Sequence, residues 1–390
     1  MNKNMDLGLK IKENFDTEQI MQLRNEVFNS LINSGFSITE DGHLILPENK
    51  DYFRKAQCNS VNYIIKKNRE FILKHDLEYI DRYVIDGKSL DPKNIEPKLI
   101  AVNNNFEGNI FKWIKMHWSI PISAGYGRRL RYIVMDRTNG AIMGIIGLSD
   151  PVFAMKDRDY YIGWSTDIRK KNLKHIMDAF VLGSIPPYSL VLGGKLVASL
   201  ISSPGIRKDF YSKYKGKKSL ISGEIFNGKL AAITTASALG KSSIYDRIKI
   251  PDGSEFIHVG WTRGSGEFQF ANNIYNKLYK LASQSVKWTK NPLWGTGTRN
   301  RRVVIQEALR MLNLPPDFNY HNIKRELFFI PLGSKSIEYL NGHAKHINYY
   351  GKTQAEISEY MLKRWVIPRS ERRKEYLEFK AEDYSLLKMI

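Results

Sequence analysis

The chain has 390 residues, a formal net charge of +20, 42% hydrophobic residues and 26% charged residues. This composition is typical of a globular protein and excludes an intrinsically disordered chain. The charge favours a polyanionic partner, above all nucleic acid, while a solvated basic surface, an anionic membrane and an acidic protein partner stay open as alternatives.

The positive charge is unevenly distributed, because residues 1–100 hold slightly more acidic than basic side chains and the excess lies after them. The single cysteine, Cys58, excludes an internal disulfide framework, so we expect a reducing compartment, the cytoplasm. The sequence contains no cluster of Cys and His ligands, so we expect no metal site. The longest apolar stretch, residues 185–201, is interrupted by prolines, glycines and a lysine, so we expect no membrane span.

The first hundred residues predict a helix-hairpin-helix module followed by a connector. Residues 15–34 have helical spacing of apolar side chains and end at Gly35. An Asp-Gly turn lies in the middle of residues 36–47, and residues 50–75 predict a second helix. We interpret this order as a winged-helix-like cap on residues 1–100, with the irregular segment 79–105 leading into the next domain.

Residues 101–285 predict an α/β core, and residues 286–390 a basic C-terminal helical extension packed on it. Strands are expected at 130–136, 141–148, 160–165, 230–236, 256–261 and 326–332, and helices at 172–182, 192–202, 272–285, 302–312 and 354–365. The fold class predicted is therefore mixed α+β, with a central mixed sheet flanked by helices.

Three arginines follow two glycines directly before a predicted strand. Arg128, Arg129 and Arg131 could grip phosphates, because guanidinium groups match phosphate oxygens. The alternative is an exposed loop whose charge is incidental.

A second glycine pair opens the predicted helix at residue 192. Gly193 and Gly194 precede Lys195, and backbone N–H groups at such a helix start can bind anions. The arrangement is similar to the way GNAT-type acyltransferases hold a pyrophosphate, which makes acyl coenzyme A a possible cofactor and a GNAT-like sheet the expected fold. Close packing at the glycines is the alternative.

The densest group of small, hydroxyl and basic side chains follows the buried strand at 230–236, where we expect the start of a helix. Such strand ends are where α/β folds place ligands. The predicted phosphate-binding residues are Gly240, Lys241, Ser242, Ser243, Tyr245 and Arg247. Ser243 and Tyr245 are also candidate catalytic groups, unless Ser243 caps a helix and Tyr245 fills the core.

Two further segments hold candidate functional groups. After the strand at 256–261, Trp261 could stack on a base, Arg263 could contact the backbone of a nucleic acid, and Glu267 is a candidate general base. Asp159, in an acidic and aromatic run taken as a turn and strand, is a candidate acid or base. No nuclease-like set of acidic metal ligands accompanies it.

Taken together, these segments resemble the DruA family of the Druantia anti-phage defence systems. The matching blocks include 118–121, 125–129, 147–153, 158–164, 177–179, 192–196, 237–247, 260–262, 324–326 and 364–365. They span roughly residues 95–375. Lys241 departs from the family, because the resemblance implies an arginine there, and a lysine keeps the charge without the bidentate geometry.

The resemblance implies a bacterial or phage-derived defence setting and action beside a helicase and other system proteins. Independently of the resemblance, an oligomer is possible. We expect a DNA-binding component that recognises invading DNA. The alternatives are a GNAT-derived enzyme that modifies or processes nucleic acid, and an adaptor whose basic face binds an acidic partner. Whether the protein is an enzyme stays open.

Overall fold

The computed structural model describes residues 15–218, 223–262, 264, 268–270, 273–285 and 298–390. The chain divides into two compact units built from segments that are distant in sequence. Unit 1 comprises Met1–Ser60 and Gly264–Ile323, and unit 2 comprises Val61–Arg263 and Lys324–Ile390. The three-part division with boundaries at residues 100 and 285 stays a prediction.

Unit 1 surrounds a small hydrophobic core to which four helices of its described residues contribute. Its elements are α1 (Thr17–Asn33), β1 (Ser37–Ile38), β2 (Leu44–Ile45), the first part of α2 (Lys50–Lys67), α9 (Asn273–Ala282) and α11 (Thr298–Met311). Asp16 and Gln19 form a capping box at the start of α1, which satisfies two backbone N–H groups there. Leu31, Leu281 and Leu309 are fully buried in the shared core. The predicted first helix and hairpin are confirmed.

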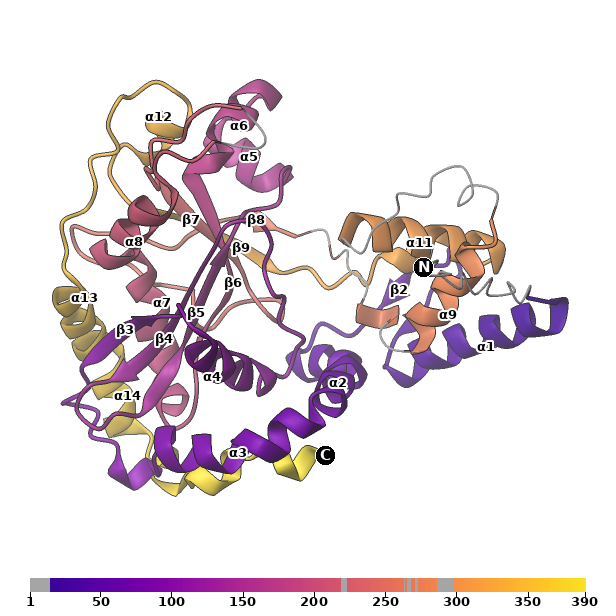
Figure 1. The fold of residues 1–390 in the computed structure, drawn as a ribbon, viewed down its shortest axis with the longest axis horizontal. Helices are drawn as coiled ribbons and strands as arrows, with labels where there is room; N and C mark the ends of the chain where they lie inside the picture. Colours follow the sequence, from indigo (N-terminus) through magenta and orange to yellow (C-terminus); the bar gives the residue numbers. More distant parts are fainter. Residues whose placement is uncertain (1–14, 219–222, 263, 265–267, 271–272, 286–297) are drawn as a thin grey trace, which may run out of the picture. The chain divides into compact units, whose positions relative to one another are not determined.

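Unit 2 is built on a seven-stranded mixed sheet, shown in Figure 1. Its strands are β3 (Pro97–Ala101), β4 (Arg129–Asp136), β5 (Ile142–Ser149), β6 (Ile176–Ser184), β7 (Ala232–Ala236), β8 (Ile257–Trp261) and β9 (Glu326–Pro331). The order is β3-β4-β5-β6-β7-β9-β8. Every neighbouring pair is antiparallel except β6 and β7, which are parallel. The predicted mixed α/β class is therefore confirmed.

The parallel pair separates after a short ladder. β6 and β7 are paired from Ile176 opposite Ala232 to Ala179 opposite Thr235. β6 then continues to Ser184 while still paired with β5, whereas β7 ends at Ala236. The two strands therefore diverge in the middle of the sheet, and the gap between them must be filled by side chains or lined as a cavity.

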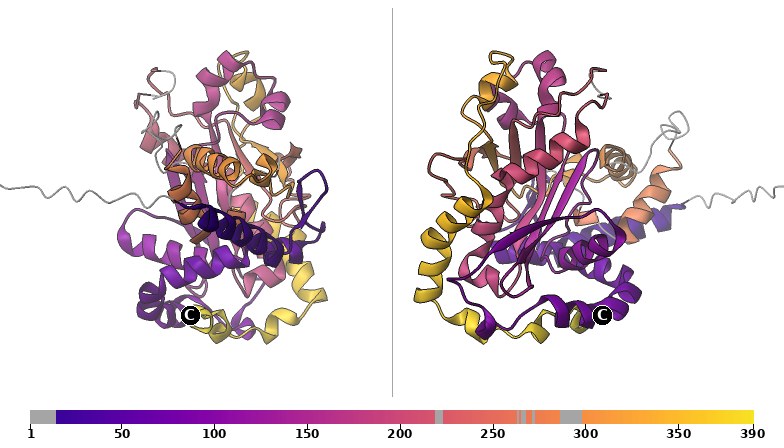
Figure 2. Two further views of the ribbon diagram at one scale, coloured as in Figure 1. Left: turned by 90° about the vertical axis from the view of Figure 1, so that its right-hand side faces the viewer. Right: turned by 60° about the vertical axis from the view of Figure 1, so that its left-hand side comes forward.

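Helices cover both faces of this sheet (Figures 1 and 2). One core cluster joins the sheet to α3 (Arg69–Tyr83) and α4 (Asn105–Met116), and another joins it to α7 (Gly193–Ser199), α8 (Pro204–Tyr214) and α13 (Gln354–Met361). The alternation of β4 side chains produces the two layers, because Tyr132 belongs to the second cluster and Ile133 to the first. After α14 (Ile367–Arg372), the C-terminal segment, yellow in Figure 2, returns to pack on α3.

Four expectations were wrong. Residues 160–165 are not a strand, because α5 (Lys156–Ile162) is helical and ends where Gly163 has a left-handed φ of 81°. Residues 176–182 form β6 rather than a helix, since periodicity cannot separate a buried strand from a helix in a short apolar run. The connector 79–105 contains the edge strand β3, and the segment after β7 forms turns rather than a helix.

Candidate functional site

A cavity of about 580 Å³ lies where β6 and β7 diverge. The end of β6, residues 180–184, forms one wall. The loop Ser123–Tyr126 and the turn 242–245 contribute to the others, and Arg325 precedes β9. The cavity therefore brings together three segments that the sequence singled out separately, near Arg128, at the start of α7 and after β7.

An acidic and a basic side chain, Asp178 and Arg325, both line this cavity. Asp178 of β6 lies opposite Thr234 of β7, and the Thr234 hydroxyl donates to Asp178 Oδ1 over 2.6 Å. Burial raises the pKa of Asp178, against the opposing effect of Thr234 and two arginines. Burial lowers the pKa of Arg325, which Asp178 counteracts. Arg325 Nε is buried and has no hydrogen-bond partner among the described residues.

Asp159, the predicted acid or base, lies in a buried ion cluster. Its carboxylate binds the Arg158 guanidinium at 2.6 Å and the Arg169 guanidinium at 2.9 Å. Arg158 is fully buried and also donates to the carbonyls of Val152 and Phe153. With two guanidinium partners, Asp159 anchors the loop beside the cavity, and its geometry offers no free carboxylate to a substrate.

The glycine-arginine loop places its three arginines in different surroundings. Arg128 binds Asp150 at 2.6 Å and donates to the Lys174 carbonyl, so its side chain is committed within the protein. Gly127 has a φ of +64°, and a Cβ there would collide with the Asp150 carboxylate. Arg129 is exposed and Arg131 is partly exposed, so these two remain available to a phosphate.

Lys195 connects the glycine-led helix to the turn after β7. Its ammonium donates to the carbonyls of Ile244 at 2.8 Å and Asp246 at 2.5 Å, and it lies 4.6 Å from the centre of the Trp365 ring. Burial lowers its pKa to about 8. The glycines beside it are packed closely, since a Cβ on Gly193 would meet the Tyr188 carbonyl.

The turn after β7 is held by its own hydrogen bonds. The Ser242 hydroxyl accepts from the backbone N–H groups of Ile244 and Tyr245, and the Ser242 N–H donates to Glu326. Tyr245 is buried, its hydroxyl donates to the Leu182 carbonyl, and burial raises its pKa to about 12. Gly240 has a φ of 67° within this turn. Tyr245 therefore has a structural position in the cavity wall.

The other predicted residues are more exposed. Lys241, Ser243 and Arg247 are exposed, and Arg247 forms an ion pair with Asp246 at 3.2 Å. Trp261 is 36% exposed at the end of the edge strand β8 and does not line the cavity. Arg263 and Glu267 lie outside the described residues.

A cluster of cations lies beside the loop at the cavity. Arg131 of β4 lies over the Phe111 ring of α4, and Lys213 donates to the Arg129 carbonyl at 3.0 Å. Burial lowers the pKa of Lys115, and three neighbouring cations lower it further, namely Arg131, Arg129 and Lys112. We define the basic cluster as Lys112, Lys115, Arg129, Arg131, Lys213 and Lys217. In the described part of the chain, none of these six forms an ion pair with an acidic side chain.

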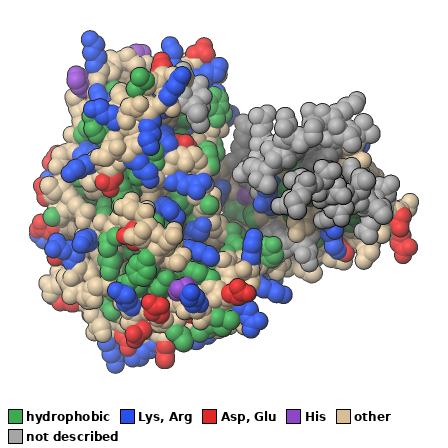
Figure 3. All heavy atoms as spheres, in the orientation of Figure 1, with side chains coloured by type: hydrophobic (Ala, Val, Ile, Leu, Met, Phe, Trp, Pro, Cys, Tyr) green, Lys and Arg blue, Asp and Glu red, His purple; other side chains and the backbone are tan. Residues whose placement is uncertain are grey.

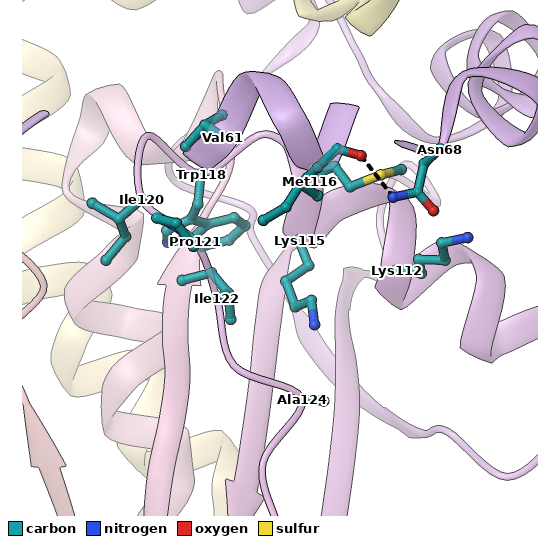
Figure 4. Close-up of a pocket in the computed structure, with 11 residues that line it drawn as sticks. Val61, Asn68, Lys112, Lys115, Met116, Trp118, Ile120, Pro121, Ile122 and Ala124 are labelled. Carbon is teal, nitrogen blue, oxygen red and sulfur yellow. Dashed lines mark hydrogen bonds between the residues drawn. The ribbon is translucent and has the colours of Figure 1, made fainter. Parts of the chain in front are cut away.

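The basic cluster and the cavity are separated by one short segment. Lys112 and Lys115 line a smaller pocket of about 260 Å³ together with Trp118, Pro121 and Ile122 (Figure 4). Trp118, Pro121 and Ile122 also line the larger cavity. The segment from residue 118 to residue 122 is therefore a wall shared by both hollows.

Asp178 and Arg325 were missed as site residues. The sequence did contain a signal, because a single aspartate interrupts the apolar run from Ile176 to Leu182. That run was interpreted as a helix, on which an aspartate is unremarkable on the solvent side. Arg325 lies in one of the blocks that carry the family resemblance, but nothing in the sequence places it beside Asp178. The order of strands in the sheet brings the two residues into the lining of one cavity.

Among the described residues, no three His, Cys, Asp or Glu side chains are grouped closely enough to hold a metal ion. Within the same ranges, no helix has both the length and the apolar character that crossing a bilayer requires.

Comparison with known proteins identifies the family. A family model described as Druantia protein DruA matches residues 47–342. The Druantia protein DruA of Escherichia coli (strain UMEA 4076-1) is 34% identical over 367 residues, which cover 93% of this chain and 90% of that protein. No solved structure matches the chain. The chain therefore belongs to the DruA family of Druantia proteins.

Proposed function

We propose that this DruA-family protein is the nucleic-acid-binding component of a Druantia anti-phage defence system, and that the basic cluster is its phosphate-binding surface. The observation that carries this proposal is the set of six neighbouring cations without acidic partners among the described residues. Like charges held together are unfavourable in isolation, and the phosphates of a polyanion relieve their repulsion. Lys and Arg side chains are also distributed widely over the face of unit 2 seen in Figure 3.

The salt dependence of binding tests this surface. Replacing Arg129, Arg131 and Lys213 together by glutamine removes three candidate phosphate contacts. We expect the slope of log K against log salt to become shallower by about 3 for a DNA duplex, because each phosphate contact contributes about one unit. Fluorescence anisotropy over a salt series measures this slope.

A matched control removes the same charge elsewhere in unit 2. Lys171, Lys335 and Lys345 are exposed and their side chains form no ion pair in the described part of the chain. The triple glutamine variant at these positions is expected to keep the wild-type slope. An unchanged slope in the basic-cluster variant, or an equal loss in the control, would contradict the proposed surface.

A second candidate function is enzymatic, through descent from a GNAT-type acyltransferase. It is supported by the single parallel pair that diverges around a cavity and by the glycine-led α7 that follows β6. The start of α7 does not itself fit a pyrophosphate. The Lys195 ammonium already donates to two backbone carbonyls, and Gly193 packs closely against the Tyr188 carbonyl. Calorimetry with acetyl-coenzyme A, and mass spectrometry of nucleosides after incubation, test this candidate.

We also propose that a helicase and other Druantia proteins are partners, and that residues 1–100 include a winged-helix-like cap. The order α1, β1, β2, α2 supports the latter. Co-purification of partners after nuclease treatment separates direct protein contacts from contacts that a shared DNA molecule provides. Loss of every partner on nuclease treatment would contradict a direct contact.

A further inference from the structure

We propose that the cavity between β6 and β7 receives one nucleobase of a single strand bound on the basic cluster, and that Asp178 and Arg325 contact the edge of that base. This inference rests on the proposed function, because the basic cluster holds the sugar-phosphate backbone from which the base enters.

One side chain that lines the cavity has a buried polar atom without a partner among the described residues. Arg325 is partly exposed and lines the cavity, and its buried Nε has no hydrogen-bond partner among the described residues. A buried polar group without a partner is costly, and native structures satisfy such groups with protein, water or ligand. A ligand that presents a hydrogen-bond acceptor to Arg325 would remove this cost.

The pairing of Arg325 with Asp178 narrows the chemistry of that ligand. Both side chains line the cavity, one a hydrogen-bond donor and the other an acceptor, so the lining matches a neutral polar molecule better than an anion. A carboxylate accepts hydrogen bonds and a guanidinium donates them, so the ligand must carry a donor close to an acceptor. The edges of nucleobases present donors and acceptors side by side in this way, and arginine and aspartate both bind them.

The walls of the cavity suit a flat ring. Trp118, Phe180 and Leu182 line it, which gives it an aromatic and apolar surface beside its polar groups. Tyr126 also lines it and is 48% exposed, as expected of a residue at the opening. Aromatic side chains stack on bases, and about 580 Å³ lies within the range of small-molecule pockets.

The cavity is placed where a base from the basic cluster would enter. Ser123 lines the cavity, and its carbonyl accepts a hydrogen bond from Lys115 of the basic cluster at 3.3 Å. Arg129 follows Tyr126 by three residues and begins β4. A strand whose phosphates contact Lys115 and Arg129 therefore passes the opening, and proteins that bind single strands commonly turn a base away from the backbone into a pocket.

Binding of a strand with bases and of one without them tests the inference. The probes are a fluorescein-labelled single strand of about twelve nucleotides and an abasic sugar-phosphate oligomer of equal length and charge. For the wild-type protein we expect the base-containing strand to bind at least about tenfold more tightly, since one stacked and hydrogen-bonded base contributes that much.

Variants locate the effect in the cavity. Asp178→Asn keeps an acceptor for Thr234, and Arg325→Gln removes the guanidinium. Each is expected to lose the preference for bases by about tenfold while binding the abasic oligomer like wild type. The triple variant of Arg129, Arg131 and Lys213 is expected to weaken both strands together.

The outcomes separate this inference from the proposed function. Equal affinity of the wild-type protein for both strands overturns the nucleobase site and leaves the phosphate surface intact, and this arm needs no variant to fold. An undiminished preference in folded Asp178→Asn and Arg325→Gln proteins also overturns it. Release of the strand by acetyl-coenzyme A but not by deoxynucleosides overturns it in favour of acyl transfer. Failure of both strands to bind at low salt refutes the proposed function itself.

Discussion

Replacing Lys195 by methionine removes an ammonium that fixes part of the cavity wall. The side chain is 2% exposed and donates to the carbonyls of Ile244 and Asp246 at 2.8 and 2.5 Å. Methionine keeps the apolar stem and its packing against Trp365, while the two carbonyls lose their donor. The variant therefore isolates the polar contribution of Lys195.

The expected loss is about 2 kcal/mol of unfolding free energy near pH 7. Two hydrogen bonds from a charged donor contribute about 1.5–3 kcal/mol each. Burial opposes this, because lowering the pKa to about 8 from 10.5 corresponds to roughly 3 kcal/mol against the charged form. The difference leaves a modest stabilisation that the methionine variant lacks.

The same pKa gives the sign of the pH dependence. The unfolded chain keeps the Lys195 proton up to about pH 10.5, whereas the folded chain releases it near pH 8. Between these values the unfolded state binds more protons, so wild-type stability rises with pH relative to the methionine variant. Urea unfolding followed by circular dichroism at about pH 7 and about pH 9.5 measures both effects.

Lys241→Met is the control, because Lys241 is exposed. Its unfolding free energy is expected to stay within about 0.5 kcal/mol of wild type. If Lys195→Met unfolds like wild type but binds DNA more weakly, Lys195 contacts the ligand directly and the role in fixing the turn is refuted.

Two further predictions concern buried polar groups elsewhere in unit 2. Burial lowers the pKa of His175 to about 4. As the pH falls from about 6.5 to 4, the unfolded chain therefore binds a proton before the folded chain does, and the wild-type protein loses roughly 3 kcal/mol of unfolding free energy. His175→Asn should remove this loss in urea unfolding, and parallel pH profiles for the two proteins would contradict it. Asp76 accepts hydrogen bonds from Trp113 at 2.6 Å and from the Ser385 hydroxyl at 2.7 Å. Asp76→Ala should therefore lower the unfolding free energy by about 3 kcal/mol and speed hydrogen exchange in residues 381–390. Asp81→Ala, on the exposed side of α3, should do neither. Equal effects of the two substitutions would contradict the role of Asp76 in holding the C-terminal segment on α3.

Local patterns in the sequence determined much of the secondary structure. The spacing of apolar side chains predicted α1, and Asp41-Gly42 predicted the hairpin that follows it. The turn at Gly140 predicted the pairing of β4 with β5. These features depend on residues close together in the chain, so the sequence carries them without knowledge of the fold. The family blocks likewise needed only the order of residues.

The tertiary structure decided which charged groups remain available. Arg128, Asp159 and Lys195 were plausible ligand contacts in the sequence, and each is satisfied by partners within the protein. Asp178 and Arg325 gained their position only because β6 and β9 flank β7, although 147 positions separate them in the numbering. The basicity that the sequence placed after residue 100 is thereby reduced to a defined cluster of cations beside a cavity. A charge is available to a ligand when folding has left it without an opposite charge beside it, and that depends on contacts between distant segments.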